Sequence, residues 1–325
     1  RRIVLMNARL PPTARLMKLR HHRPYVRSVA AALMATTALA APANTTIPDF
    51  SSNGTAWQTG NGGDYTAVPG SPSPMRQDPA HPFVGNNTGG QPTYRIGDVG
   101  NPNLKPWAKA AMKKDNDEVL KGKIAFTARS SCLPGGVPQF LLFGGQPIFF
   151  IQTPDKVLMI YEGDHQVRHI YLNVPHSKNP APSWYGESVG HYEGDTLIVD
   201  TIGVNGKTVI DEFDTPHTDK LHVVERYQLV DDAAAKAASA KNDREYGRAD
   251  GPAADGVFVD YAYKGKGIHV EFTVEDPNTF TTPWSGAVTY LRAGNEWEER
   301  VCAENTFEYY HGKDTSVPTA DKPDF

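Results

Sequence analysis

The stretch Gly186–Thr201 constrains the fold of this chain more than any other part of it. Two runs of alternating character flank Gly194-Asp195, and a two-residue turn that begins with glycine is typical of a β-hairpin. The turn sets the register of the two strands, which pairs Glu193 with Thr196, His191 with Ile198 and Val189 with Asp200. The chain is therefore predicted to be an antiparallel β protein.

Successive side chains of a strand point to opposite faces, so this register sorts the hairpin into two faces. One face carries Glu187, His191, Glu193 and Asp200, and the other carries Tyr192, Leu197 and Val199. If the first face lines a barrel cavity, the low dielectric and the neighbouring carboxylates are expected to set the pKa of His191 near neutrality. A histidine of this kind suits acid–base chemistry. The alternative is that this polar face meets solvent, as in any half-buried strand pair.

Short strand-like runs continue from about residue 147 to residue 302, separated by turn sequences rich in Gly, Pro, Asp and Asn. They predict an all-β fold, an antiparallel meander of roughly eight to ten strands that closes into a lipocalin-like barrel. A two-sheet β-sandwich is the alternative. One amphipathic helix is predicted at 106–121, and the Ala-rich piece 231–241 is predicted to be a short surface helix or a mobile insertion.

Four regions are predicted along the chain. Residues 1–42 form a leader in which Met17 opens a basic region and an apolar run that together match a secretory signal peptide. Residues 43–104 form an irregular polar arm, a spacer or alternatively a strap that docks on the domain. Residues 105–310 form the β-barrel domain, and 311–325 a mobile tail. We therefore expect a protein exported to the periplasm or beyond, without a membrane anchor.

The cysteine count and the net charge restrict which partners, metals and cofactors we expect for this protein. Cys132 and Cys302 are the only two cysteines, and export favours one disulfide between them. The formal net charge of the whole chain is −4, which argues against nucleic acid as a partner. His165 and His169 are four residues apart but lie in a strand–turn–strand segment, so no zinc helix is expected. We predict no metal and no tightly held cofactor; a metal held by His191, Glu187 and a distant His222 or His269 is the open alternative.

Several further residues are candidates for a binding site. Arg168 lies between aliphatic neighbours and could hold a carboxylate or an oxyanion, or else form an ion pair with a carboxylate such as Glu225. His217 and Asp211 lie in a loop, 211–218, that either closes over a barrel mouth or is a solvated turn. The predicted substrate contacts are Tyr161, Tyr171, Trp184, His217, Glu225 and Trp284.

The pattern Gly186-x-Ser188-x-Gly190 matches the nucleophile elbow of α/β-hydrolases. A hairpin follows it where a helix belongs, which argues against an acyl-enzyme at Ser188.

The hairpin, together with Glu225-Arg226, Asp276-Pro277, Pro283-Trp284 and Glu299-x-x-Cys302-x-Glu304-Asn305, resembles a family of uncharacterised exported bacterial β proteins. In that family the hairpin usually reads Gly-x-Ser-x-Gly-x-Trp-Glu-Gly-Asp-Thr-Leu-Val-Val-Asp-Thr. This chain has Tyr192 where Trp is usual and Ile198 where Val is usual. The resemblance covers about 132–305 and implies no activity.

These observations favour an exported small-molecule enzyme of the lyase, isomerase or hydrolase type, with acid–base chemistry in the barrel cavity. The predicted catalytic residues are His191, Glu187, Asp200 and Arg168. The alternative is a periplasmic lipocalin-like binder of an apolar small molecule. In either case the expected partner is a small organic molecule, and the oligomeric state is left open.

Overall fold

The computed structural model describes residues 47–51, 55–59, 65–82, 96–123, 132–142, 147–163, 166–245, 259–260, 262–294 and 301. Contacts divide the chain into two units, Arg1–Ala43 and Asn44–Phe325, and the described residues all belong to the second. The predicted leader, the predicted tail and Cys302 lie outside the described residues. The signal peptide and the disulfide therefore stay predictions.

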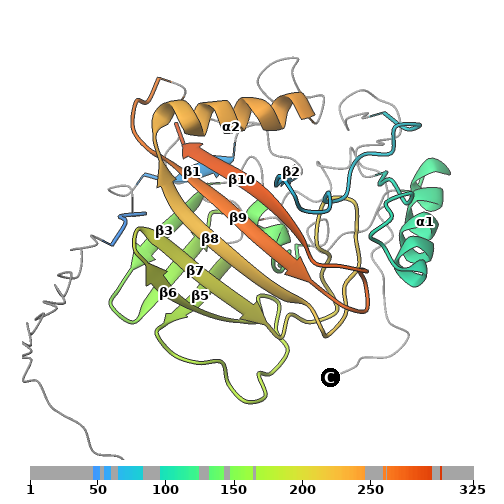
Figure 1. Ribbon diagram of the computed structural model, residues 1–325, viewed down its shortest axis with the longest axis horizontal. Helices are drawn as coiled ribbons and strands as arrows, with labels where there is room; N and C mark the ends of the chain where they lie inside the picture. Colours follow the sequence, from blue (N-terminus) through green and yellow to red (C-terminus); the bar gives the residue numbers. More distant parts are fainter. Residues whose placement is uncertain are drawn as a thin grey trace, which may run out of the picture. The chain divides into compact units, whose positions relative to one another are not determined.

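One sheet closes on itself to form a β-barrel (Figure 1). The strands lie around it in the order β1 (Trp57–Thr59), β3 (Ile148–Gln152), β4 (Lys156–Tyr161), β5 (Gln166–Leu172), β6 (Glu187–Glu193), β7 (Thr196–Ile202), β8 (His222–Val230), β9 (Gly267–Glu275) and β10 (Trp284–Arg292). A pairing between β10 and β1 closes the barrel. The predicted all-β barrel is confirmed, and the sandwich alternative is wrong.

The closing strand comes from the segment 43–104, which was predicted to be an irregular arm. There β1 pairs with β10 on one side and with β3 on the other, and β2 (Thr66–Ala67) pairs with β10 further along the same edge. Trp57 and Tyr65 from this segment are buried in the core. The described part of this segment therefore docks on the barrel, as in the strap alternative, and is not a spacer.

The meander is not antiparallel throughout, which corrects the prediction. Strands β5 and β6 run parallel, with Tyr171 opposite Val189. They are joined by residues 173–186, called the crossover segment below, which contains three prolines and forms neither helix nor strand. Gly186 ends it at a φ of +63°, where a Cβ would lie 2.4 Å from the carbonyl oxygen of Ile202. This crossover carries part of the candidate site.

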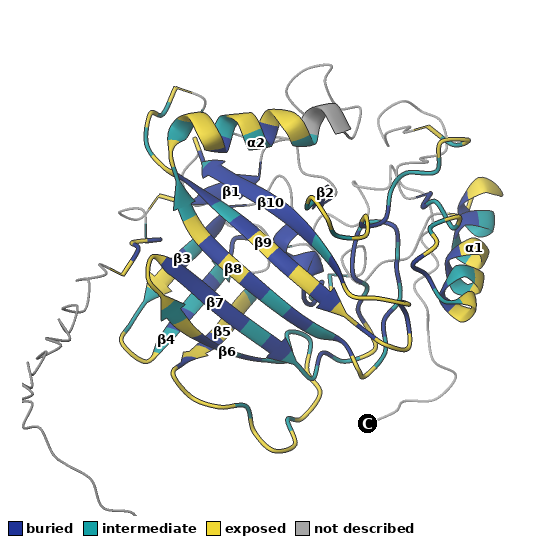
Figure 2. Ribbon diagram, in the orientation of Figure 1, coloured by how far each residue is buried: buried dark blue, intermediate teal, exposed yellow. Residues whose placement is uncertain are grey.

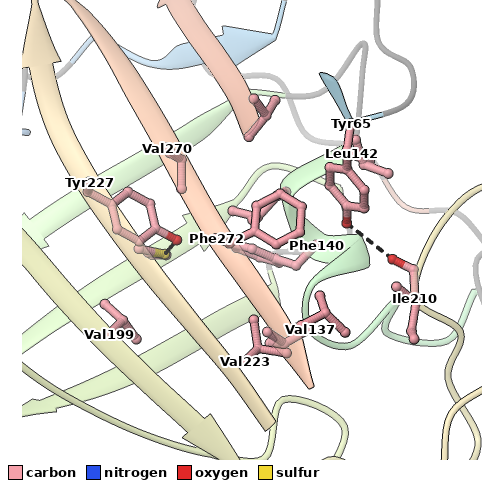
Figure 3. Close-up of a cluster of buried hydrophobic side chains, with 14 of the residues drawn as sticks. Tyr65, Val137, Phe140, Leu142, Val199, Ile210, Val223, Tyr227, Val270 and Phe272 are labelled. Carbon is pink, nitrogen blue, oxygen red and sulfur yellow. Dashed lines mark hydrogen bonds between the residues drawn. The ribbon is translucent and has the colours of Figure 1, made fainter. Parts of the chain in front are cut away.

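The barrel interior is filled by the alternating side chains of its strands, while many outward-facing positions are exposed (Figure 2). Figure 3 shows part of this cluster, with Phe140 and Phe272 beside Tyr65. Phe140 comes from the 3-10 helix η4 (Gln139–Leu142). The Tyr65 hydroxyl donates to the carbonyl of Ile210 at 3.1 Å, so the predicted arm contacts the chain just before the 211–218 loop.

Two helices accompany the barrel. Helix α1 (Pro106–Leu120) matches the predicted amphipathic helix, begins with proline in its first turn and buries Ala108, Met112, Asn116 and Val119. Helix α2 (Asp232–Glu245) is the Ala-rich piece and packs on β9 and β10 (Figure 1). None of the helices among the described residues has the length and apolar character needed to cross a bilayer.

Candidate functional site

The predicted hairpin forms with the predicted register, but its polar face points outward. Glu193 pairs with Thr196 and Val189 with Asp200, and Gly194 has a φ of +64° as its turn requires. Ser188 and Gly190 of β6 and Leu197, Val199 and Thr201 of β7 are buried on the interior side. The cavity interpretation of Glu187, His191 and Asp200 is therefore wrong, since the apolar face of the hairpin is the one that fills the barrel.

His191 does not join Glu187 or Asp200. Its side chain is 50 % exposed, and its Nε2 lies 3.0 Å from Oε1 of Glu193, its neighbour two residues along the same face of β6. Arg226 of β8 contacts the same Glu193 carboxylate. The predicted catalytic histidine is therefore hydrogen-bonded to an exposed carboxylate, away from Glu187 and Asp200.

Two other histidines take its place beside Glu187 and Asp200. The crossover segment carries His176 over the outer face of β6 and β7, where Nδ1 lies 3.0 Å from Glu187 Oε1 and Nε2 lies 2.9 Å from Asp200 Oδ1. His222 of β8 places its own Nε2 2.9 Å from the same Asp200 oxygen. Its Nδ1 lies 3.8 Å from Glu275 at the end of β9. We call His176, Glu187, Asp200, His222 and Glu275 the outer cluster.

The strand register and the crossover segment together bring the residues of the outer cluster to one place. Glu187 and Asp200 lie on the outward face of the hairpin, and His222 faces Glu275 across the β8–β9 pair. The backbone N–H and the hydroxyl of Ser177 donate to the Glu187 carboxylate at 2.7 and 2.6 Å. These bonds hold the crossover segment on the barrel wall.

The geometry of the outer cluster indicates which of its atoms carry protons. An ionised carboxylate only accepts hydrogen bonds, so Nε2 of His222 carries the proton that faces Asp200. The hydrogen bond from His222, together with one from His176, holds the pKa of Asp200 below its usual range despite partial burial. The same bond to Asp200 raises the pKa of His222. Hydrogen bonds led by that from Ser177 lower the pKa of Glu187.

Arg168 lies inside the barrel and forms the ion pair that was the alternative to a substrate contact. Its side chain and that of Glu225 are fully buried, and Nη1 lies 2.9 Å from Glu225 Oε1. Nη2 contacts the other carboxylate oxygen and the hydroxyl of Thr201, while Nε donates to Ser188. Tyr227 donates to Glu225 as well. Arg168 and Glu225 therefore neutralise each other within a satisfied network, and the Ser188 hydroxyl is part of it.

The 211–218 loop is buried. His217 is 8 % exposed, donates from Nδ1 to the carbonyl of Thr218 and accepts at Nε2 from the hydroxyl of Thr208, at 2.9 and 2.8 Å. Burial lowers the pKa of His217, in agreement with this neutral form. Asp211 is also buried and accepts from the backbone N–H groups of Phe213 and Thr215. Both residues shape the loop, so neither the solvated turn nor an open barrel mouth describes them.

The four predicted aromatic contacts separate into two groups. Tyr161 and Trp284 point into the barrel and are nearly inaccessible, as parts of the packed core. Tyr171 points outward from β5 and is 45 % exposed, so it lies on the barrel wall and not in the cavity. Trp184 lies partly exposed in the crossover segment.

Sequence reasoning assigned no role to His176 and Glu275 and named His222 only as a possible metal ligand. His222 could have been found by extending the hairpin register to the next strand, since Asp200 pairs with Val224 and a diagonal neighbour lies within reach. No local signal in the proline-rich crossover places His176 there. Within the residues that the structure describes, no three histidine, cysteine or carboxylate side chains are arranged to hold a metal ion.

Comparisons of the chain with known proteins found no relative. No family model, no curated protein sequence and no solved structure matches the chain.

Proposed function

We propose that the protein is a small-molecule enzyme of the lyase, isomerase or hydrolase type whose proton-transfer site is the outer cluster on the barrel wall. The observation that supports this is the Asp200–His222 pair, in which a carboxylate orients an imidazole through Nε2. The other ring nitrogen, Nδ1, lies 3.8 Å from Glu275, beyond hydrogen-bond distance. A carboxylate that fixes the tautomer of a histidine and leaves the opposite nitrogen available is the arrangement used for general base catalysis.

The residues of the cluster take separate roles in this proposal. His222 Nδ1 removes a proton from the substrate, or from a water that attacks it, and returns the proton to the product. Asp200 holds the ring and stabilises the imidazolium that forms. His176 has carboxylate oxygens on both ring nitrogens, so it positions Asp200 and Glu187 and transfers no proton. About a third of the His222 side chain is exposed, which leaves the ring open to a small molecule from solvent.

Turnover by two histidine variants tests the proposal. The protein and its variants would be assayed on a panel of uncharged esters, lactones and β-hydroxy ketones. We expect His222→Gln to lower kcat/KM on any substrate turned over by at least about a hundredfold, the usual contribution of a general base. His191→Gln is the matched control, because His191 is also exposed and paired with a carboxylate but lies outside the cluster. Equal rates for the two variants, with unchanged circular dichroism, would refute the proposal.

The pH dependence of the rate tests the role of Asp200 separately. His222 must be neutral to act as a base, and Asp200 raises its pKa above the ordinary value of 6.5. The rate should therefore rise with pH through a value above 6.5. Removing the charge with Asp200→Asn should move this rise in rate to lower pH and reduce the maximal rate. An unchanged midpoint of the rise would show that Asp200 does not act on the titrating group.

A second candidate, a lipocalin-like binder, is supported by one observation in the barrel core. Among the described residues, the indole N–H of buried Trp284 has no acceptor, and such a donor is normally paired. The acceptor oxygen of one buried water or of a small ligand would satisfy it. Native mass spectrometry of the purified protein, compared with its denatured mass, tests for such a molecule; a released compound identical before and after incubation supports a carrier, and one converted to product supports an enzyme.

A further inference from the structure

The middle of the crossover segment is attached to the barrel at one place. The backbone N–H groups of Asn173 and Ser183 fix its two ends, at 2.7 and 3.1 Å from carbonyl oxygens in β6 and just after β7. Residues 174–182 lie between these ends and are mostly exposed (Figure 2). Within this stretch, which the structure describes in full, only His176 and Ser177 form hydrogen bonds to the barrel. The segment is therefore a loop fixed at both ends and held in the middle by two residues.

The two hydrogen bonds of His176 require a positively charged ring. Its nitrogens lie 3.0 Å from Glu187 Oε1 and 2.9 Å from Asp200 Oδ1, and an ionised carboxylate only accepts hydrogen bonds. A neutral imidazole has a single N–H, so one of the two contacts would then place a lone pair against a carboxylate oxygen. Both contacts are favourable together only when the ring carries two protons. Closure of the segment therefore depends on the charge of one side chain.

The groups around His176 are two carboxylates and a second histidine. Hydrogen bonds lower the pKa of both Glu187 and Asp200, so both stay ionised in the range in which histidines titrate. His222 shares the Asp200 oxygen, and the third carboxylate of the outer cluster lies on the far side of His222. Lys178 of the segment is exposed and forms no ion pair with a described carboxylate. Of the groups bonded to the two carboxylates, the two histidines are those whose charge changes between about pH 5 and pH 8.

From these contacts we infer that the crossover segment is a pH-dependent latch over the outer cluster. At mildly acidic pH, His176 is an imidazolium that bridges Glu187 and Asp200 and keeps the segment closed on the barrel wall. Loss of one ring proton at higher pH leaves one carboxylate without its donor, and the middle of the segment opens. Because the protonated ring stabilises the closed form, closure is present at low pH and is lost as the pH rises.

The latch regulates the site of the proposed function, and its effect on turnover rests on that function. Oδ1 of Asp200 faces Nε2 of both His176 and His222, at 2.9 Å each. When the segment opens, His222 keeps this oxygen alone and the wall beside it is uncovered. His222 acts as a base in its neutral form, so opening of the latch and formation of the base both follow a rise in pH.

Solvent exchange of two backbone amides tests the latch without requiring turnover. The Ser177 N–H donates to Glu187 in the closed segment, whereas the Asn173 N–H belongs to a fixed end. Both exchange rates would be measured by NMR at about pH 6 and about pH 7.5 and compared with the intrinsic rates, which removes the direct effect of pH on exchange. We expect the protection of Ser177 to fall by about three- to tenfold at the higher pH, the size of a partly exposed charged hydrogen bond. The protection of Asn173 should not change.

Two variants assign the response to one histidine. His176→Gln has no charge to lose, so Ser177 should be weakly protected at both pH values. His222→Gln is the matched control, because it removes the other histidine on Asp200 and leaves His176 in place; the pH response of Ser177 should persist. Equal protection of Ser177 at both pH values in the native protein, or an undiminished response in His176→Gln, would overturn the inference.

The outcomes separate the latch from the proposed function. If the protection of Ser177 does not respond to pH while His222→Gln loses turnover, the latch is wrong and the proton-transfer site stands. If Ser177 responds as expected but His222→Gln keeps full turnover, the proposed function fails and the latch stands. The ring nitrogens of His176, followed by NMR in the same samples, give the last check: a midpoint that differs from that of Ser177 protection would show that another group controls the segment.

Discussion

At the residue scale, the feature with the largest energetic consequence is the ion pair between Arg168 and Glu225. Both side chains are fully buried, so removing one partner leaves the other charge in a low-dielectric interior. We expect Arg168→Met to lower the free energy of unfolding by about 3–5 kcal/mol. The double variant Arg168→Met/Glu225→Gln should recover much of this loss, because it removes both charges and keeps an acceptor for Tyr227.

Urea unfolding of the two single variants and the double variant completes a thermodynamic cycle for the pair. If the double variant loses as much stability as the two single variants combined, the two charges do not depend on each other, contrary to the hydrogen-bond geometry. A large recovery together with an unchanged barrel would show that the pair contributes little net stability, as is common for buried ion pairs.

Residue chemistry was only partly predictable from the sequence. The partner of Arg168 could be anticipated, since a basic side chain between aliphatic neighbours needs a buried carboxylate. The direction of the hairpin faces could not, because alternation specifies which residues share a face and not which face turns inward. Val189 and Ile198 among polar residues suggested an inward face, but in the structure they lie on an outer wall that is apolar on its β5 side.

At the element scale, the short strand β1 is the part on which barrel closure depends. Trp57 of β1 is buried, donates from its indole nitrogen to the carbonyl of Phe50 at 2.7 Å, and lies beneath the guanidinium of Arg292 at 5.0 Å. We expect Trp57→Ala to lower the free energy of unfolding by about 3–5 kcal/mol, the usual cost of deleting a buried tryptophan. Trp107→Ala on α1 is the control, because Trp107 is 42 % exposed. Equal losses in urea unfolding would contradict a closing role for β1.

The strands from β3 onward could be predicted because each carries alternation bounded by turn residues, and the register of β6 and β7 followed from one glycine-first turn. Strand β1 could not be predicted, since three residues in a polar segment have no period to detect. The parallel pairing of β5 with β6 was missed for a related reason. It depends on how a proline-rich segment runs back along the barrel, which local propensity does not encode.

At the scale of the whole molecule, the ion pair of Arg168 and Glu225 lies inside the barrel, whereas the proposed proton-transfer site lies on its outer wall. Arg168 and Glu225 are fully buried and paired with each other, whereas the His222 side chain of the outer cluster is about a third exposed. The proposed chemistry at the outer cluster therefore does not require the core to open. We expect stability and activity to depend on different titrating groups. Their pH dependences should therefore differ.

The stability of the whole molecule should depend on pH through Asp211. Burial raises the pKa of Asp211 from its ordinary 3.8 to about 6. The native state therefore keeps a proton that the unfolded chain releases between about pH 4 and pH 6, so stability from this group is full below pH 4 and is lost as the pH rises through 6. The difference between these two pKa values corresponds to about 3 kcal/mol of stability.

Replacing Asp211 by Asn should remove this dependence. The amide oxygen can still accept from the backbone N–H groups of Phe213 and Thr215, at 2.9 and 3.3 Å in the native chain, but it carries no charge to bury. We expect Asp211→Asn to raise the free energy of unfolding by about 2–3 kcal/mol at pH 8 and to change it little at pH 4. Asp219→Asn, at an exposed aspartate in the neighbouring turn, is the control. A gain of the same size at both pH values would show that packing, and not ionisation, limits this loop, while a loss at pH 8 would mean that the carboxylate charge itself is required.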